Sequence, residues 1–176
     1  QTALCVINGH KRQGNKLHLF VSQAVEFLEN TERLSWLQEQ HRTGLLSRDE
    51  LTFEFKLSAI ADNLKSAKSC FELLNKIGIS TLLTGVTQSA EAQRVLSHLP
   101  VSYIKLDISL LKNPGKELKD LIDLAHSLDL KVIAPQIEDP RSIATLWSSG
   151  TDFVQGNFVQ RPENNLIYDF SEAVLD

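Results

Sequence analysis

The sequence predicts an α/β fold in which six parallel strands alternate with helices. Its 176 residues suffice for one domain with a single core. Apolar runs of strand length alternate along the chain with stretches that have the 3.6-residue spacing of amphipathic helices. Prolines 100, 114, 135 and 140 fall between these segments, where a missing N–H costs least. Because strands joined by helices pair in parallel, we expect either an open doubly wound sheet or part of a (β/α)₈ barrel.

The elements follow one another without a visible linker or domain boundary. An amphipathic helix runs from Thr2 to about Gln13 and stops at Gly14-Asn15. The next helices are predicted at about residues 28–42, 66–76, 90–99, 117–128 and 141–149. Residues 51–55 alternate Leu, Phe and Phe with Thr and Glu, the period of a strand. The six predicted strands span about residues 17–22, 51–56, 79–84, 101–106, 131–134 and 152–155.

Composition excludes several classes of function. A net charge of −4 provides no basic surface for duplex nucleic acid. The apolar runs are too short to cross a bilayer, and the chain does not open with a secretory signal. Cys5 and Cys70 form neither a CxxC pair nor a metal-ligand spacing, so we interpret them as structural thiols of a cytoplasmic protein.

Functional side chains of a parallel sheet gather at the carboxyl ends of its strands. Alternation directs one carboxylate, Glu54, to the inner face at that end, and no other strand end supplies an obvious partner. Metal-assisted hydrolysis needs several oxygen ligands around a cation, so these residues favour a binding face. No GxGxxG or P-loop sequence is present. All five histidines are predicted on helices, helix ends or a strand start, and surface or capping roles are expected for His10, His18, His41, His98 and His126.

Three segments resemble strand motifs of EAL domains, which act on cyclic-di-GMP. Residues 101–107, VSYIKLD, resemble the family's VDYVKID strand. Residues 131–138, KVIAPQIE, stand where the family has VIAEGVE, and residues 150–158, GTDFVQGNF, match GxDYVQGYxF. Residues 138–147 and 155–160, with Tyr168-Asp169-Phe170, are further similar to the FimX-type regulators of type IV pili.

The resemblance implies an incomplete EAL-type (β/α)₈ barrel, with residues 1–176 forming the later three-quarters of a single degenerate EAL domain. The family's first two strands, with the Glu-Ala-Leu tripeptide, have no counterpart in the sequence. Residues 84–92 also lack the family's DDFGTGYSSL character, so the usual enzyme dimer is not expected.

The same resemblance implies that the metal site is degenerate and that the chain is not an enzyme. Glu54 matches a metal-binding Glu of the family and Lys105 matches its catalytic Lys. The replaced positions are Ser22 for a metal-binding Asn, Thr84 and Gly85 for an Asp-Asp pair, and Pro135 for the first Glu of AEGVE. With one carboxylate left, Mg²⁺ would not exchange its hydration shell for this site, and we expect neither metal nor cofactor.

Cyclic-di-GMP binding is expected to survive, because recognition of a dinucleotide does not require metal. Glu138 is placed to accept hydrogen bonds from the guanine edge, or alternatively to oppose the dipole of the next helix. Gln136 is expected to cover a base, Lys105 to contact a phosphate, and the Gln155-Gly156 backbone to approach the ligand closely. The FimX-type resemblance further implies a PilZ-domain partner.

Three other functions stay open. The chain is alternatively a protein-interaction scaffold that no longer binds nucleotide, an active cyclic-di-GMP phosphodiesterase, or an unrelated barrel enzyme with a small phosphorylated substrate.

Overall fold

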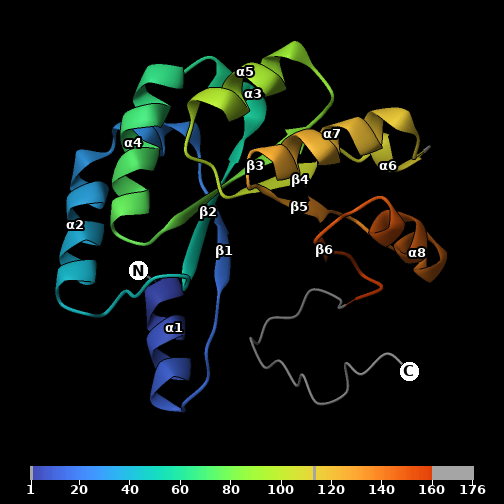
Figure 1. Ribbon diagram of the computed structural model, residues 1–176. Helices are drawn as coiled ribbons and strands as arrows, with labels where there is room; N and C mark the ends of the chain where they lie inside the picture. Colours follow the sequence, from blue (N-terminus) through green and yellow to red (C-terminus); the bar gives the residue numbers. More distant parts are fainter. Residues whose placement is uncertain (1, 113, 160–176) are drawn as a thin grey trace.

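A computed structural model describes residues 2–112 and 114–159. Its six strands form one parallel sheet in the order β1-β2-β3-β4-β5-β6. Every strand therefore pairs with its neighbours in the sequence, and the order never reverses as it does in a doubly wound sheet. The sheet curls into part of a barrel, with helices along its outer side (Figure 1). The incomplete barrel is confirmed, and the doubly wound alternative is wrong.

The strands are β1 (Leu19–Ser22), β2 (Leu51–Lys56), β3 (Ser80–Val86), β4 (Tyr103–Leu106), β5 (Lys131–Ala134) and β6 (Phe153–Val154). The α-helices are α1 (Thr2–Arg12), α2 (Thr31–Arg42), α3 (Leu57–Ala61), α4 (Leu64–Lys76), α5 (Ala90–His98), α6 (Ser109–Lys112), α7 (Lys116–Ser127) and α8 (Pro140–Ser148). A 3₁₀ helix, η1, spans Val25–Glu29. No helix within residues 2–112 and 114–159 combines the length and apolar character needed to span a bilayer.

The helix predicted over residues 28–42 is confirmed as α2, but it begins later than predicted because Asn30 separates it from the residues before. The Asn30 side chain accepts a hydrogen bond from the backbone N–H of Arg33 at 2.9 Å, and so caps the N-terminus of α2. The residues before it form η1. The cap at Asn30 thus starts a new helix inside a stretch whose apolar spacing continues without a break.

Two short helices, α3 and α6, and the true end of β3 were also missed. Helix α3 follows β2 directly, with no connecting loop to mark its start. Strand β3 continues past the predicted end at Thr84 to Val86, because Gly85 forms a bulge with φ of +72° that shifts the register toward β4. Glycine adopts this left-handed conformation without a steric penalty.

The two faces of the sheet carry different side chains. Phe53, Leu83 and Ile104 point outward into the main core beneath the helices. Leu82 and Ile133 are also buried but lie on the inner face, outside that core cluster. The inner face therefore has an apolar floor of its own.

Aromatic rings line the inner face toward the amino ends of the strands. The rings of Phe20 in β1 and Tyr103 in β4 pack edge to face, with centroids 5.5 Å apart, although β2 and β3 lie between their strands. The ring of Tyr103 also packs against that of Phe153 in β6, with centroids 6.3 Å apart. The ring of His18 stacks on that of Phe20, with centroids 4.8 Å apart. Contact across so many strands requires a strongly curled sheet.

Candidate functional site

At the carboxyl end of the inner face, three of the predicted residues meet. The Nζ of Lys105 donates a hydrogen bond to Oε1 of Glu54 at 2.6 Å, and Ser22 Oγ donates to Oε2 of the same carboxylate at 3.2 Å. Alternation of β2 and β4 directs Glu54 and Lys105 inward, and the side chains are 12% and 14% exposed. Lys105 and Ser22 thus engage both oxygens of Glu54.

This group of side chains does not fit a Mg²⁺ ion. Glu54 is its only carboxylate, and both of its oxygens already accept hydrogen bonds from protein groups. A hard cation would have to displace Lys105 and then compete with water using one carboxylate and one hydroxyl. Among the described residues, no group of three or more His, Cys, Asp or Glu side chains could hold a metal ion.

Thr84 and Gly85 lie beside this group at the end of β3. Thr84 pairs in register with Lys105, so its side chain shares the inner face. A Cβ atom on Gly85 would lie 4.0 Å from Oδ2 of Asp107. Asp107 itself accepts hydrogen bonds from the Ser109 hydroxyl and backbone N–H, which lower the pKa of its carboxyl. The Asp107 carboxylate is therefore engaged by Ser109, the residue that begins α6.

The loops that follow β5 and β6 are fastened to each other by their backbones. Ile137 N–H donates to the Gln155 carbonyl at 2.9 Å, and Phe158 N–H donates to the Ile137 carbonyl at 3.1 Å. A Cβ on Gly156 would lie 2.2 Å from the nitrogen and oxygen of Ile137, so only glycine fits. Gly156 thus allows the two loops to pack closely through the Ile137 backbone.

Gln136 and Glu138 both line a pocket of about 620 Å³ between α6 and α8. Both side chains are exposed, and Gln136 adopts a left-handed φ of +55°. The apolar part of the pocket comes from Ile108, Leu111 and Leu146. Sequence reasoning missed this wall because α6 was not predicted, and because the packing of Ile108 and Leu111 near Leu146 of α8 is a tertiary contact. The pocket combines an apolar wall with a carboxylate and an amide, as ligand sites commonly do.

Capping of α8 is performed by Asp139 and not by Glu138. The Asp139 carboxylate accepts the backbone N–H of Arg141 at 2.9 Å, and Pro140 occupies the first turn. Glu138 precedes the cap and lines the pocket.

The predicted site residues therefore fall into two groups. Ser22, Glu54 and Lys105 are joined on the inner face, while Gln136 and Glu138 lie in the pocket. Within the part of the chain that the structure describes, no hydrogen bond joins Lys105 to either pocket residue. Pro135 and Gln155 belong to the paired loops between the two groups.

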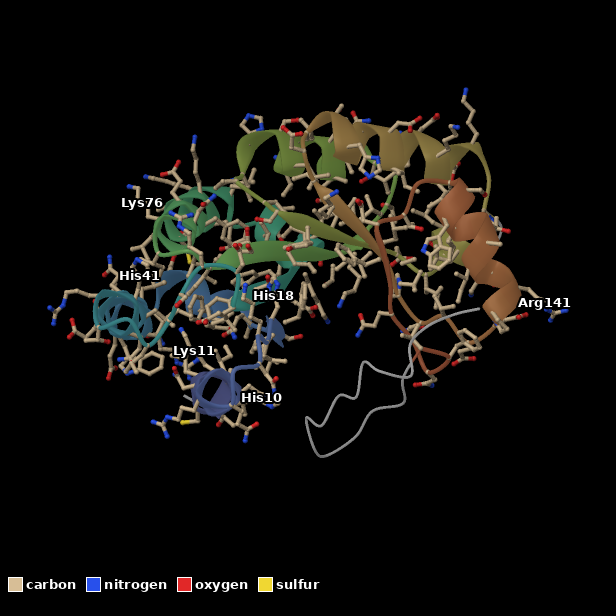
Figure 2. All side chains as sticks on the ribbon, turned by 60° about the horizontal axis from the view of Figure 1, so that its bottom comes forward. His10, Lys11, His18, His41, Lys76 and Arg141 are labelled. Carbon is tan, nitrogen blue, oxygen red and sulfur yellow. The ribbon has the colours of Figure 1, made fainter. Side chains whose placement is uncertain are left out.

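The histidines lie outside both groups. His10 and His41 are on α1 and α2, while Arg141 is at the opposite side of the molecule on α8 (Figure 2). His18 immediately precedes β1, whereas Ser22 ends that strand. The Nε2 of His18 lies 2.7 Å from Oγ1 of Thr52.

The profile of the EAL domain matches residues 6–162. An uncharacterized 76.5 kDa protein of Thiocystis violacea is 28% identical over 92% of this chain, which covers 23% of that protein. The cyclic di-GMP phosphodiesterase NbdA of Pseudomonas aeruginosa is 26% identical over 64% of the chain and 15% of its own length. The chain thus spans less than a quarter of these relatives.

Solved structures of EAL domains also resemble this chain. A FimX EAL domain superposes with a TM-score of 0.88 at 26% identity, covering 96% of this chain and 70% of that one. The FimX EAL domain of Pseudomonas aeruginosa bound to c-di-GMP gives 0.83 at 27% identity, over 94% and 71% of the two chains.

Proposed function

The chain belongs to the EAL domain family, and we propose that it is a non-catalytic receptor module for cyclic-di-GMP. The observation that carries the proposal is the hydrogen bond of Lys105 to Glu54 at 2.6 Å. In an EAL enzyme these two residue types serve hydrolysis, by the resemblance described above. Here the carboxylate is engaged by Lys105 and Ser22, and its neighbours Thr84 and Gly85 bring no charge.

Binding is proposed to combine the pocket with the inner face. Glu138 accepts hydrogen bonds from the donor edge of a guanine, and Gln136 covers the base against the apolar wall. Lys105 provides a cation for a phosphate. The loop around Gln155 and Gly156, which is hydrogen-bonded to the loop after β5, fixes the position of the pocket relative to the inner face. The similarity to a FimX EAL domain bound to c-di-GMP supports this ligand.

The proposal is tested by calorimetry of the protein with cyclic-di-GMP in the presence of a chelator. We expect saturable binding without divalent metal, and at least about tenfold weaker binding for Glu138→Gln, which loses a charge-assisted acceptor. Glu72→Gln on the exposed side of α4 is the matched control and should leave the affinity unchanged. Absence of binding to the unaltered protein at high ligand concentration would contradict the proposal.

Hydrolysis is tested separately, because relatives of this chain are named cyclic di-GMP phosphodiesterases. Incubation of the protein with cyclic-di-GMP and Mg²⁺ or Mn²⁺ should yield no linear pGpG by chromatography. Production of pGpG that disappears in Glu54→Gln would establish an enzyme.

A scaffold that does not bind nucleotide is the second candidate, favoured by the partly exposed rings of Phe20 and Phe153 on the inner face. We further propose, from the resemblance to FimX-type regulators, that the output is type IV pilus assembly or motility through a PilZ-domain partner. Pull-down of a PilZ-domain protein that is equal with and without cyclic-di-GMP would favour the scaffold.

A further inference from the structure

A pocket of about 740 Å³ lies on the outer face of the sheet, between α1, α2 and the first two strands. Its walls combine polar residues with apolar and aromatic ones, which include Leu4, Phe27, Leu37 and Phe53. It is separated from the inner face by the sheet itself, because Phe53 points outward whereas Glu54 points inward. The pocket is therefore independent of the residues proposed to bind cyclic-di-GMP.

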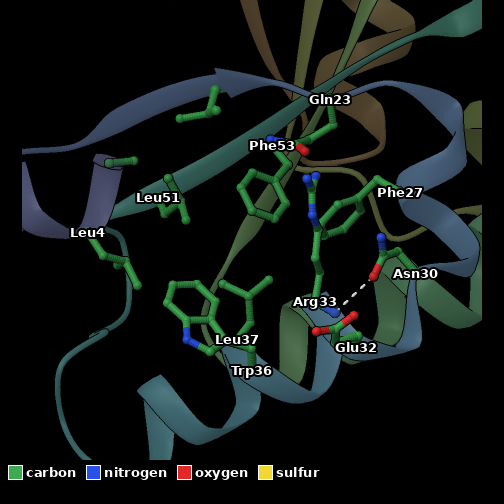
Figure 3. Close-up of a pocket in the computed structure, with 12 residues that line it drawn as sticks. Leu4, Gln23, Phe27, Asn30, Glu32, Arg33, Trp36, Leu37, Leu51 and Phe53 are labelled. Atoms are coloured by element: carbon green, nitrogen blue, oxygen red, sulfur yellow. Dashed lines mark hydrogen bonds between the residues drawn. The ribbon is translucent and has the colours of Figure 1, made fainter. Parts of the chain in front are cut away.

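Arg33 is the unusual residue of this pocket. It precedes Trp36 and Leu37 by three and four positions, so it lies at the edge of the face of α2 that packs toward the sheet, and it is itself exposed. Figure 3 shows its side chain extending from α2 past the rings of Phe27 and Phe53 toward Gln23. Arg33 remains exposed, so its cation is accessible to a ligand at this pocket.

No carboxylate of the described residues neutralises Arg33. The ion pairs formed within residues 2–112 and 114–159 do not include it. Glu32 is the single carboxylate of the lining, and in Figure 3 it stays at the start of α2 while the guanidinium lies farther up the pocket. The pocket consequently presents one positive charge, on an exposed side chain that lies beside aromatic residues.

From this geometry we propose that the pocket binds a small amphiphilic anion, consisting of an aromatic or aliphatic body and one carboxylate or sulfonate group. The anionic group pairs with the guanidinium of Arg33, whose planar fork suits such oxygens. Gln23 offers an amide donor beside it, and the body lies between Phe53 and Trp36. The volume falls within the range of roughly 300–1,000 Å³ that small-molecule sites have.

The probe is anilinonaphthalene sulfonate, which has an aromatic body and one anionic group. Trp36 lines the pocket and Trp147 is exposed on α8, so Trp147→Phe leaves Trp36 as the only tryptophan. We expect saturable quenching of Trp36 by the dye. Arg33→Leu should weaken binding about tenfold or more, and Arg33→Lys should retain most of it.

The matched control is Arg42→Leu, which removes the same charge from the surface of α2, where Arg42 pairs with Glu39. It should leave dye affinity unchanged. The neutral analogue phenylnaphthylamine should bind equally to the unaltered protein and to Arg33→Leu. Excess cyclic-di-GMP should not displace the dye.

Three results would overturn the proposal: no quenching of Trp36, equal affinity of the unaltered protein for the neutral and anionic dyes, or displacement by cyclic-di-GMP. The comparison of the two dyes uses the unaltered pocket, so it decides the question even if Arg33→Leu fails to fold. Failure of cyclic-di-GMP binding leaves this test unaffected, because the two sites share no residue.

Discussion

The Nζ of Lys105 lies 2.6 Å from Oε1 of Glu54, although the two residues belong to β4 and β2 with β3 between them. The contact exists because the curled sheet brings inward-facing side chains of alternate strands together, as in the interior layers of a barrel. Both side chains are largely withdrawn from water, so neither charge is well hydrated on its own. Loss of one partner therefore leaves the other poorly compensated.

Lys105→Met should lower the free energy of unfolding by about 1–3 kcal/mol, because Glu54 loses its cation in a site with little water. Urea unfolding followed by circular dichroism measures this. Arg42→Met is the matched control, since the Arg42–Glu39 pair is 74% and 51% exposed and should contribute little to stability. Equal effects of the two substitutions would show that the Lys105–Glu54 pair contributes no more to stability than an exposed ion pair.

Gly156→Ala should destabilise the protein by about 2–4 kcal/mol, the cost of displacing buried backbone, and should weaken cyclic-di-GMP binding by separating the two loops. Gly9→Ala provides the control. Gly9 lies within α1 with nothing near its Cβ position, so alanine there should stabilise by about 0.5–1 kcal/mol. Thermal melts of both variants test the difference in sign.

Acid stability should depend on Asp152. Burial raises the pKa of this carboxyl, but the hydrogen bonds from Lys131, the Val132 N–H and His126 outweigh burial and hold the pKa below its ordinary value. A carboxyl with a lowered folded-state pKa stabilises the fold above the unfolded pKa of about 3.9, and this stability is lost as pH falls through the folded value.

Asp152→Asn should therefore be less stable than the unaltered protein at neutral pH, and the difference should shrink below about pH 4. Urea midpoints measured between neutral and acid pH check this. Asp123→Asn, on the exposed side of α7, is the matched control and should leave the urea midpoint at neutral pH unchanged. A difference in stability between Asp152→Asn and the unaltered protein that stays the same at all pH values would contradict a lowered pKa of Asp152.

The two thiols should differ in reactivity. Cys70 is buried, and burial raises the pKa of its thiol to about 11, whereas Cys5 is exposed on α1. Iodoacetamide at mildly alkaline pH should label Cys5 in the native protein and both cysteines after unfolding, because the thiolate is the reactive form. Peptide mass spectrometry identifies the labelled site, and rapid native labelling of Cys70 would contradict the buried placement.

Local sequence patterns predicted the regular elements but not their irregular junctions. The period-two alternation of residues 51–56 and the apolar run of residues 131–134 coincide with β2 and β5. Asn30 was missed as a cap because apolar spacing continues across it, and the bulge at Gly85 depends on β4, a tertiary neighbour.

Alternation also placed Glu54 on the inner face, but its pairing with Lys105 could not be predicted. That contact requires the curvature of the sheet, which no local pattern encodes. The same holds for the packing of Gly156 against the backbone of Ile137, which depends on a tertiary neighbour.

The uniform strand order also bears on how the chain folds. Because each strand pairs only with the strands next to it in the sequence, every backbone ladder closes a loop of one or two helices and their connections. Such a chain has a low contact order for a parallel sheet, and its native pairings can accumulate one unit at a time. Central strands β3 and β4 are flanked on both sides, whereas β1 and β6 end the sheet. Amide hydrogens should exchange slowest in the centre and progressively faster toward either end.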